Sequence, residues 1–195
     1  MKKLSTYLFL VLFTLQIPSQ ADDIRDFQIE GMSVGDSLLN YFDKEKIESY
    51  KRPYPKSDKF YNFETIESKY QVYTNVQFDF KKNDEKYIIY SIGGGIFYKD
   101  IKKCNKKKEE VVSEIKEIVE EQVKVEYFDK YPHSPVYPNS TVESAEMYFK
   151  SGDIVRVYCL DWSEKVTEEK NWSDHLAVNI STKAYREFLD NEAYD

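Results

Sequence analysis

Alternating apolar and polar residues mark one stretch of the chain as a β-strand. Valine, threonine and phenylalanine stand at every second position from Val72 to Phe80, with polar residues or tyrosine between them. A polar turn follows, and residues 87–98 are again rich in β-branched and aromatic side chains. Because neighbouring residues of a strand point to opposite faces, the pattern predicts an antiparallel hairpin with one buried face.

A helical period appears in residues 109–126. Valines and isoleucines recur there three and four positions apart, and charged residues lie between them. The apolar stripe consists of Val111, Val112, Ile115, Ile118, Val119 and Val123. It predicts an amphipathic helix that packs on the protein's own sheet. Shorter helices are predicted over residues 31–42, where Ser33 and Asp36 resemble a capping box, and over residues 182–189.

Further strands are predicted over residues 60–66, 145–149, 154–162 and 176–180, whereas the prolines of residues 131–138 predict an extended loop. The elements then follow the order helix and three strands, twice. We therefore predict an α+β fold: an antiparallel sheet of about six strands, built as two α-β-β-β units, with helices packed on one face. The predicted organisation is one domain over residues 22–195, with halves at 22–103 and 104–195.

The first 21 residues have the three parts of a secretory signal peptide. Lys2 and Lys3 supply the positive start, Leu4 to Ile17 is mostly apolar, and small residues precede a cleavage site after Ala21. The alternative is an uncleaved membrane anchor, but the apolar span of about 14 residues is shorter than the roughly 20 that a bilayer requires. The sequence therefore predicts a periplasmic or secreted protein without a transmembrane segment after cleavage.

The charge balance is acidic. The chain has 28 Lys and Arg against 35 Asp and Glu, for a formal net charge of −7. Proteins that bind nucleic acid generally carry a basic surface, so this balance argues against nucleic acid as a partner. One local exception is the run from Lys99 to Lys108, which contains six lysines. This basic patch is a candidate contact for an anionic surface or an envelope protein, or else a solvated turn.

The two cysteines, Cys104 and Cys159, predict one disulfide, because an even count in an exported protein favours pairing. The alternatives are a nucleophilic cysteine beside His133 or His175, and a zinc site made from all four residues. No nucleophile signature surrounds either cysteine, and the spacings lack the close ligand pairs of structural zinc sites.

Three further motifs do not fit the chemistry that they suggest. Gly93-Gly94-Gly95 continues into an apolar strand rather than a helix, which predicts close packing by another element instead of a phosphate loop. Trp172-Ser173-Asp174-His175 contains the residue types of a hydrolase triad, but consecutive strand residues point to opposite faces. Acidic residues near the tryptophans suggest a sugar site, but an acid-rich chain produces such clusters by chance. We expect no catalytic residue, metal ion or cofactor.

Residues 22–39, Ser57–Tyr61, Cys104 and Asp161–Ser163 resemble uncharacterised exported proteins encoded by AT-rich genomes of marine alphaproteobacteria. The resemblance implies a periplasmic or secreted location and brings no catalytic residues. More distantly, the Gly31-Met32-Ser33 helix start followed by a three-strand meander is similar to the SmpA/OmlA-type domain of outer-membrane assembly, a non-enzymatic interaction module. The chain departs from that domain by lacking a lipidated cysteine and by carrying a second unit and a disulfide.

We therefore expect a non-catalytic binding module of the cell envelope, whose oligomeric state the sequence leaves open. Abundant aromatic residues suit a recognition surface, and the residues expected to form it are Tyr131, Tyr137, Trp162 and Trp172. One alternative is a hydrolase of envelope polymers that uses a carboxylate pair such as Asp161 and Asp174. Another is a carrier of small ligands with a closed apolar cavity.

Overall fold

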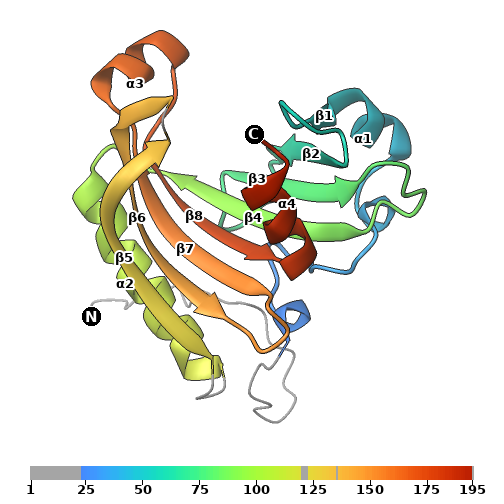
Figure 1. Cartoon of the computed structure of the whole chain (residues 1–195), viewed down its shortest axis with the longest axis horizontal. Coiled ribbons are helices and arrows are strands. Elements are labelled where there is room, and N and C mark those ends of the chain that lie inside the picture. The colour runs from blue at the N-terminus through green and yellow to red at the C-terminus, as the bar shows by residue number, and fades with distance from the viewer. Residues whose placement is uncertain (1–22, 120–122, 135, 195) are drawn as a thin grey trace, which may run out of the picture.

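One antiparallel sheet of eight strands organises the chain (Figure 1). The computed structural model describes residues 23–119, 123–134 and 136–194. The strands are β1 (Arg52–Pro53), β2 (Phe60–Thr65), β3 (Asn75–Lys81), β4 (Ile89–Phe97), β5 (Lys124–Ser134), β6 (Tyr137–Tyr148), β7 (Ile154–Asp161) and β8 (His175–Ser181). The helices are α1 (Lys44–Tyr50), α2 (Ile101–Ile118), α3 (Glu164–Lys170) and α4 (Lys183–Asn191), with short 3₁₀ turns at Ile24–Asp26 and Leu38–Asn40.

The strand order is β1-β2-β3-β4-β8-β7-β6-β5. Two meanders, β2-β3-β4 and β6-β7-β8, meet where β4 pairs with β8, from Ser91 opposite Ser181 to Phe97 opposite His175. The segments before and after residue 103 therefore share one sheet. None of the helices in the described residues has the length and apolar character needed to cross a bilayer.

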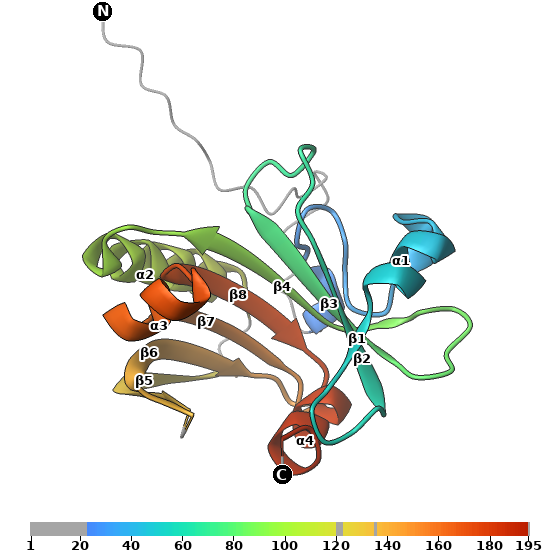
Figure 2. The same cartoon turned by 90° about the horizontal axis from the view of Figure 1, so that it is seen from above.

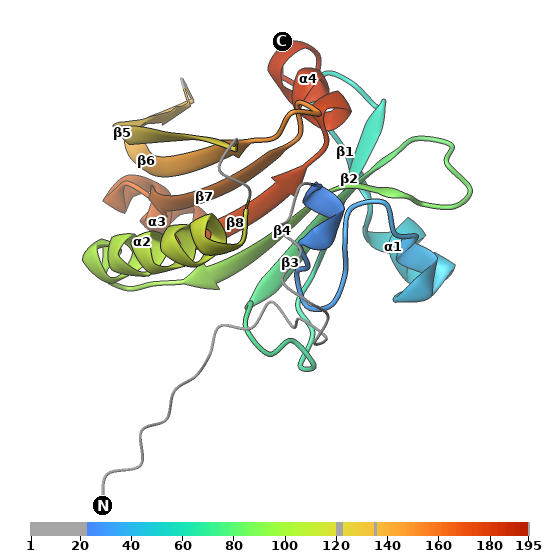
Figure 3. The same ribbon diagram turned by 90° about the horizontal axis from the view of Figure 1, so that it is seen from below.

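The sheet curves (Figures 2 and 3), and the side chains on its two faces differ in character. We call the outer face the one that carries Phe78, Ile92, Val157 and Val178, because α2 and the N-terminal segment cover it. Side chains from the strands, from α2 and from residues 24–47 form one large apolar core there. Burying alternate strand positions against an amphipathic helix explains why the sequence pattern has the two periods described above.

The predicted disulfide is confirmed. Cys104 of α2 and Cys159 of β7 are joined by an S–S bond of 2.03 Å, with 6.0 Å between their Cα atoms. A cross-link that closes a loop of 55 residues is expected to contribute about 4 kcal/mol of stability through the unfolded chain. It fixes α2 on the outer face, next to Lys108, which is 2% exposed and forms an ion pair with Glu143.

The α+β class is confirmed, but the sheet has eight strands rather than about six. The predicted loop at residues 131–138 lies in the β5–β6 hairpin. Prolines remove ladder donors and therefore suggested a break, but Pro132 lies on the edge strand, where a missing N–H is tolerated. The register between β5 and β6 shifts between Phe128 and Tyr131, and again between Pro132 and Ser134.

Three helix predictions were also wrong in detail. The helix predicted at 109–126 begins earlier, at Ile101, because the side chain of Asp100 caps its N-terminus by accepting a hydrogen bond from the Lys102 N–H. Residues 31–42 form turns and one 3₁₀ turn rather than a helix, since Gly31 and Gly35 adopt positive φ angles. The helices do not share one face of the sheet: α4 lies on the face opposite α2 (Figure 2).

Candidate functional site

The face opposite the main core, which we call the inner face, is lined mostly by polar and small residues. They alternate with the core residues along each strand, and the strand pairing places them on this face. The polar and small residues of the inner face include Asn62, Glu64, Asn75, Gln77, Asp79, Ser91, Gly93, Gly95, Ser144, Glu146, Arg156, Tyr158, His175, Ala177, Asn179 and Ser181. The same pairing also places the apolar residues Phe97, Val142, Ile154 and Leu160 on this face. A polar face on a curved sheet is a candidate recognition surface, because it is not used to build the main core.

One end of the inner face is closed by α4. Phe60, Tyr185, Phe188 and Ala193 are buried there as a second apolar cluster, which we call the α4 cluster. Beneath it, the carboxylate of Asp79 is 2% exposed and accepts hydrogen bonds from the Tyr54 hydroxyl at 2.7 Å and the Asn62 amide at 3.1 Å. Burial raises the pKa of Asp79, and the hydrogen-bond donors around it act in the opposite direction. The network explains how a buried carboxyl is tolerated.

The middle of the inner face is shaped by glycines. A Cβ atom on Gly93 would lie 2.3 Å from the side-chain oxygen of Asn179, and one on Gly95 would lie 2.3 Å from that of Asn75. On the outer face, a Cβ on Gly94 would lie 2.4 Å from the ring of Tyr73. The three glycines therefore allow close packing by other side chains, as the sequence predicted, and do not form a phosphate loop.

Arg156 links several inner-face residues. Its Nε lies 3.0 Å from Oε1 of Glu146, its Nη2 donates to the Tyr131 hydroxyl, and its guanidinium lies 4.7 Å from the ring centroid of Tyr158. Tyr131, one of the four residues predicted to bind, is placed here. It is separate from the other three, because none of the ring contacts in the described residues joins Tyr131 to them.

The other three predicted residues come together at the far end of the inner face. The ring centroids of Trp162 and Trp172 are 4.7 Å apart, and Tyr137 lies 5.6 Å from the first and 5.5 Å from the second. His133 joins them, with 5.0 Å between its ring and that of Trp162. We call these four residues the tryptophan cluster. The β5–β6 hairpin supplies His133 and Tyr137, and the ends of the connection through α3 supply the two tryptophans.

The tryptophan cluster is partly open to solvent. Trp172 is 39% exposed, and its neighbours are only partly covered. Sequence reasoning missed His133 as a member of this cluster, because it was considered only as a partner of a nucleophilic cysteine or as a zinc ligand. His175, the other histidine, lies nearby on the inner face, and burial lowers the pKa of both histidines.

Two carboxylates adjoin the tryptophan cluster. Asp161 lies 2.9 Å from Nζ of Lys130, and Oδ1 of Asp174 accepts a hydrogen bond of 2.8 Å from the Trp162 N–H. Burial raises the pKa of Asp174, the Trp162 N–H lowers it, and the charge of Asp161 raises it. Within the described residues, no group of three or more acidic, histidine or cysteine side chains is placed to hold a metal ion.

The lysines from 102 to 108 lie in the first turns of α2 rather than in a turn before the helix, and Lys99 precedes the N-cap residue Asp100. Lys108 is buried in its ion pairs with Glu143 and Glu109, and Lys107 lies 3.1 Å from Glu110. Lys102, Lys103 and Lys106 are exposed. The buried Lys108 therefore serves packing, and an anionic partner for the exposed lysines stays a prediction.

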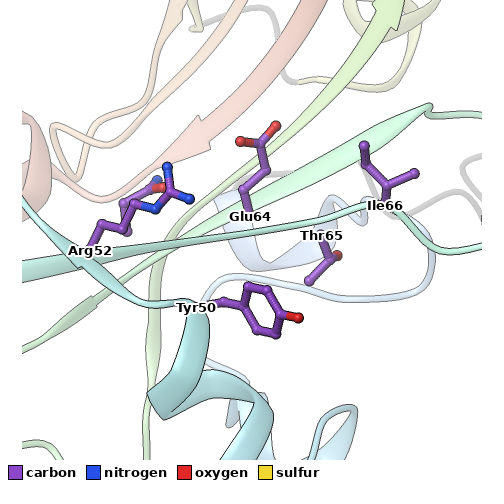
Figure 4. Close-up of a pocket in the computed structure, with 6 residues that line it drawn as sticks. Tyr50, Arg52, Glu64, Thr65 and Ile66 are labelled. Atoms are coloured by element: carbon purple, nitrogen blue, oxygen red, sulfur yellow. The ribbon is translucent and has the colours of Figure 1, made fainter.

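A shallow hollow of about 280 Å³ lies at the β1–β2 edge of the sheet (Figure 4). It is lined by Tyr50, Arg52, Asn62, Glu64, Thr65 and Ile66. Glu64 and Thr65 point to opposite sides of β2 (Figure 4), so the lining side chains do not converge on one point. No sequence pattern predicted this hollow.

Comparison of the chain with protein-family models, with curated proteins and with solved structures finds no match. The resemblances described above stay predictions, and a function has to be argued from the geometry.

Proposed function

We propose that the protein is a non-catalytic binding module that works outside the cytoplasm and holds a protein partner at the inner face and the tryptophan cluster. The observation that carries this proposal is the exposed tryptophan cluster at the open end of a polar sheet face. The main core is complete on the outer face and does not require these rings. Large aromatic residues left accessible in this way are typical of recognition surfaces.

The residue types support a protein partner. Tryptophan, tyrosine and arginine are the residues that most often dominate the binding energy of protein interfaces, and all three occur here. Arg156 is already oriented by Glu146 and Tyr131, so little side-chain freedom would be lost on binding. The disulfide supports an oxidising location, since such bonds are rare in the cytosol.

Site-specific photo-crosslinking tests the proposal. A photoreactive amino acid replaces Val136, which is 75% exposed beside Tyr137, or Ile66, which is 72% exposed at the opposite edge of the sheet. After incubation with envelope extract of the source organism, we expect a discrete adduct from position 136 and none from position 66. The adduct should disappear when Trp172 is also replaced by alanine. Equal labelling from both positions, or none from position 136, contradicts the proposal.

A polymer hydrolase is the second candidate, and the raised pKa of Asp174 beside Asp161 favours it. Against it, Asp161 is paired with Lys130 and the Trp162 N–H occupies one oxygen of Asp174. The test is release of soluble fragments from purified cell-wall polymer. A hydrolase predicts release that Asp161→Asn and Asp174→Asn each abolish, whereas a binding module predicts no release.

A further inference from the structure

The ring contacts of the tryptophan cluster are mostly edge-to-face. Tyr137 meets Trp162 at 89° and Trp172 at 72°, and His133 meets Trp162 at 81°, so these pairs are edge-to-face. In such pairs the electron-poor edge of one ring contacts the electron-rich face of the next. Trp172, which is 39% exposed, and His133, which is also exposed, are the rings through which the cluster reaches solvent. An accessible indole face is the best aromatic surface for a cation.

Elsewhere in the molecule, several aromatic rings have a lysine or arginine side chain of the same chain over one face. Lys51 lies 4.7 Å from the ring centroid of Tyr61, Lys81 lies 4.5 Å from that of Tyr90, and Arg156 covers Tyr158. Across the described ranges, no such contact reaches Trp162 or Trp172. Within the part of the chain that the structure describes, the two tryptophans, like most of the other aromatic rings, therefore have no cation of the chain over their faces.

The charge beside the tryptophan cluster is negative and only partly balanced. Asp161 has its ion pair with Lys130, but Asp174 has none with any described residue. The groups that act on Asp174 are Asp161, His175 and the Trp162 N–H. A half-buried carboxylate is stabilised by a cation placed next to it, more strongly than an exposed one would be. The ring faces and this carboxylate thus favour the same kind of group.

We propose that the tryptophan cluster and Asp174 bind an arginine side chain of the protein partner. A guanidinium stacks on an aromatic face and can donate to a carboxylate oxygen at the same time, and its charge strengthens both contacts relative to those of a neutral donor. The net charge of −7 attracts a basic partner over longer range. This inference rests on the proposed function, because it names the chemistry that the same site recognises.

Tryptophan fluorescence gives a direct test, because the chain has only two tryptophans and both lie in the tryptophan cluster. The probes are the hexapeptide Gly-Arg-Gly-Arg-Gly-Arg and its analogue with citrulline, which is nearly isosteric with arginine but uncharged. We expect the arginine peptide to change the emission saturably and to bind about tenfold more tightly than the citrulline peptide. Equal responses to the two peptides, or none to either, would overturn the inference.

Matched variants separate the site from general charge attraction. Asp174→Asn keeps an acceptor for the Trp162 N–H and should weaken binding of the arginine peptide about fivefold or more. Asp190→Asn removes the same charge from α4, at the other end of the inner face, and should change binding by less than about twofold. If both variants weaken binding equally, the attraction is unspecific and the inference fails.

A third variant covers the case in which Asp174→Asn does not fold. Trp172→Leu keeps an apolar side chain but removes the π face, and Trp162 still reports on the site. Loss of the preference for arginine over citrulline is expected, and a retained preference counts against the inference. The crosslinking result is independent. If a partner is crosslinked but the arginine peptide binds no more tightly than the citrulline peptide, the proposed function stands and the inference about arginine fails. If the arginine peptide binds more tightly but no partner is crosslinked, the cation site stands and the proposed function fails.

Discussion

At one end of the inner face, Phe60 of β2 and Phe188 of α4 are completely buried where the helix packs on the sheet, whereas at the other end Trp172 keeps 39% of its surface exposed. Both ends are aromatic, and both lie at the ends of the central strands β4 and β8. At the α4 cluster, Tyr54 and Asn62 satisfy the buried carboxylate of Asp79. At the tryptophan cluster, Asp174 lacks an ion pair among the described residues. The same residue types thus complete the fold at one end and remain available at the other.

The difference should appear most strongly in stability. Phe188→Ala is expected to lower the free energy of unfolding by about 3–5 kcal/mol, because it leaves a cavity in place of a fully buried ring. Trp172→Ala should cost about 1 kcal/mol or less, since the exposed ring makes fewer packing contacts. Urea denaturation at neutral pH measures both values. Equal losses from the two variants would show that the tryptophan cluster is part of the core.

The pH dependence of stability sharpens the contrast at the α4 end. A carboxyl whose pKa is raised by folding binds its proton more tightly in the native state, so stability falls as pH rises from the ordinary aspartate value near 3.8. The contribution of Asp79 to the slope of the free energy of unfolding against pH is at most about 1.4 kcal/mol per pH unit. Asp79→Asn should remove this slope and be more stable than the wild type at pH 7. Denaturant titrations between pH 4 and 8 are the measurement, and an unchanged slope would contradict the assignment.

Hydroxyl deletions compare the two ends at the level of single hydrogen bonds. The Tyr185 hydroxyl contacts that of Tyr54 in a buried network, so Tyr185→Phe should cost about 1–2 kcal/mol. Tyr137→Phe is the matched control, because no described residue hydrogen-bonds its hydroxyl, and it should change stability by less than about 0.5 kcal/mol. Thermal unfolding of the two variants side by side tests the difference. Similar losses would mean that Tyr137 has a polar role.

The smallest expected effect lies at the tryptophan end and has the opposite sign. The pKa of His175 is lowered by burial, so the native state resists its protonation, and stability is lost as pH falls below the ordinary histidine value near 6.5. His175→Asn should reduce the loss in the free energy of unfolding between pH 7 and 5. Part of that loss should remain, because His133 also has a lowered pKa. If the variant loses as much stability as the wild type between pH 7 and 5, His175 is not the titrating group.

Much of the fold was predictable because strand alternation and helical period record the outer face directly. Phe78 and Val178 are spaced as core residues and are core residues, and the cysteine count predicted the disulfide. The start of α2 was missed because its first turns, which Asp100 caps, contain five lysines and few apolar residues to mark a helical period. Asp79 resembles any outward-facing polar residue of a half-buried strand. It becomes buried only because α4 folds onto the inner face, and local sequence carries no record of that contact.

The candidate site was predictable in its residue types but not in its boundaries. Tryptophan and tyrosine near a hairpin end suggested Tyr137, Trp162 and Trp172, which do come into contact. Tyr131 lies elsewhere on the inner face, where its hydroxyl accepts a hydrogen bond from Arg156. His133 could not be placed, because its position depends on the pairing of β5 with β6.

The interrupted register of β5 has a consequence for behaviour at high concentration. β5 is the outermost strand, and the breaks after Phe128 and Pro132 interrupt its hydrogen-bonding edge, with Asp129 and Lys130 at the first break. A straight, uncharged edge would template strands from other copies and lead to fibrils. A bent and charged edge is a poor template, so the protein can keep Tyr127 and Phe128 exposed on its outermost strand without seeding amyloid growth.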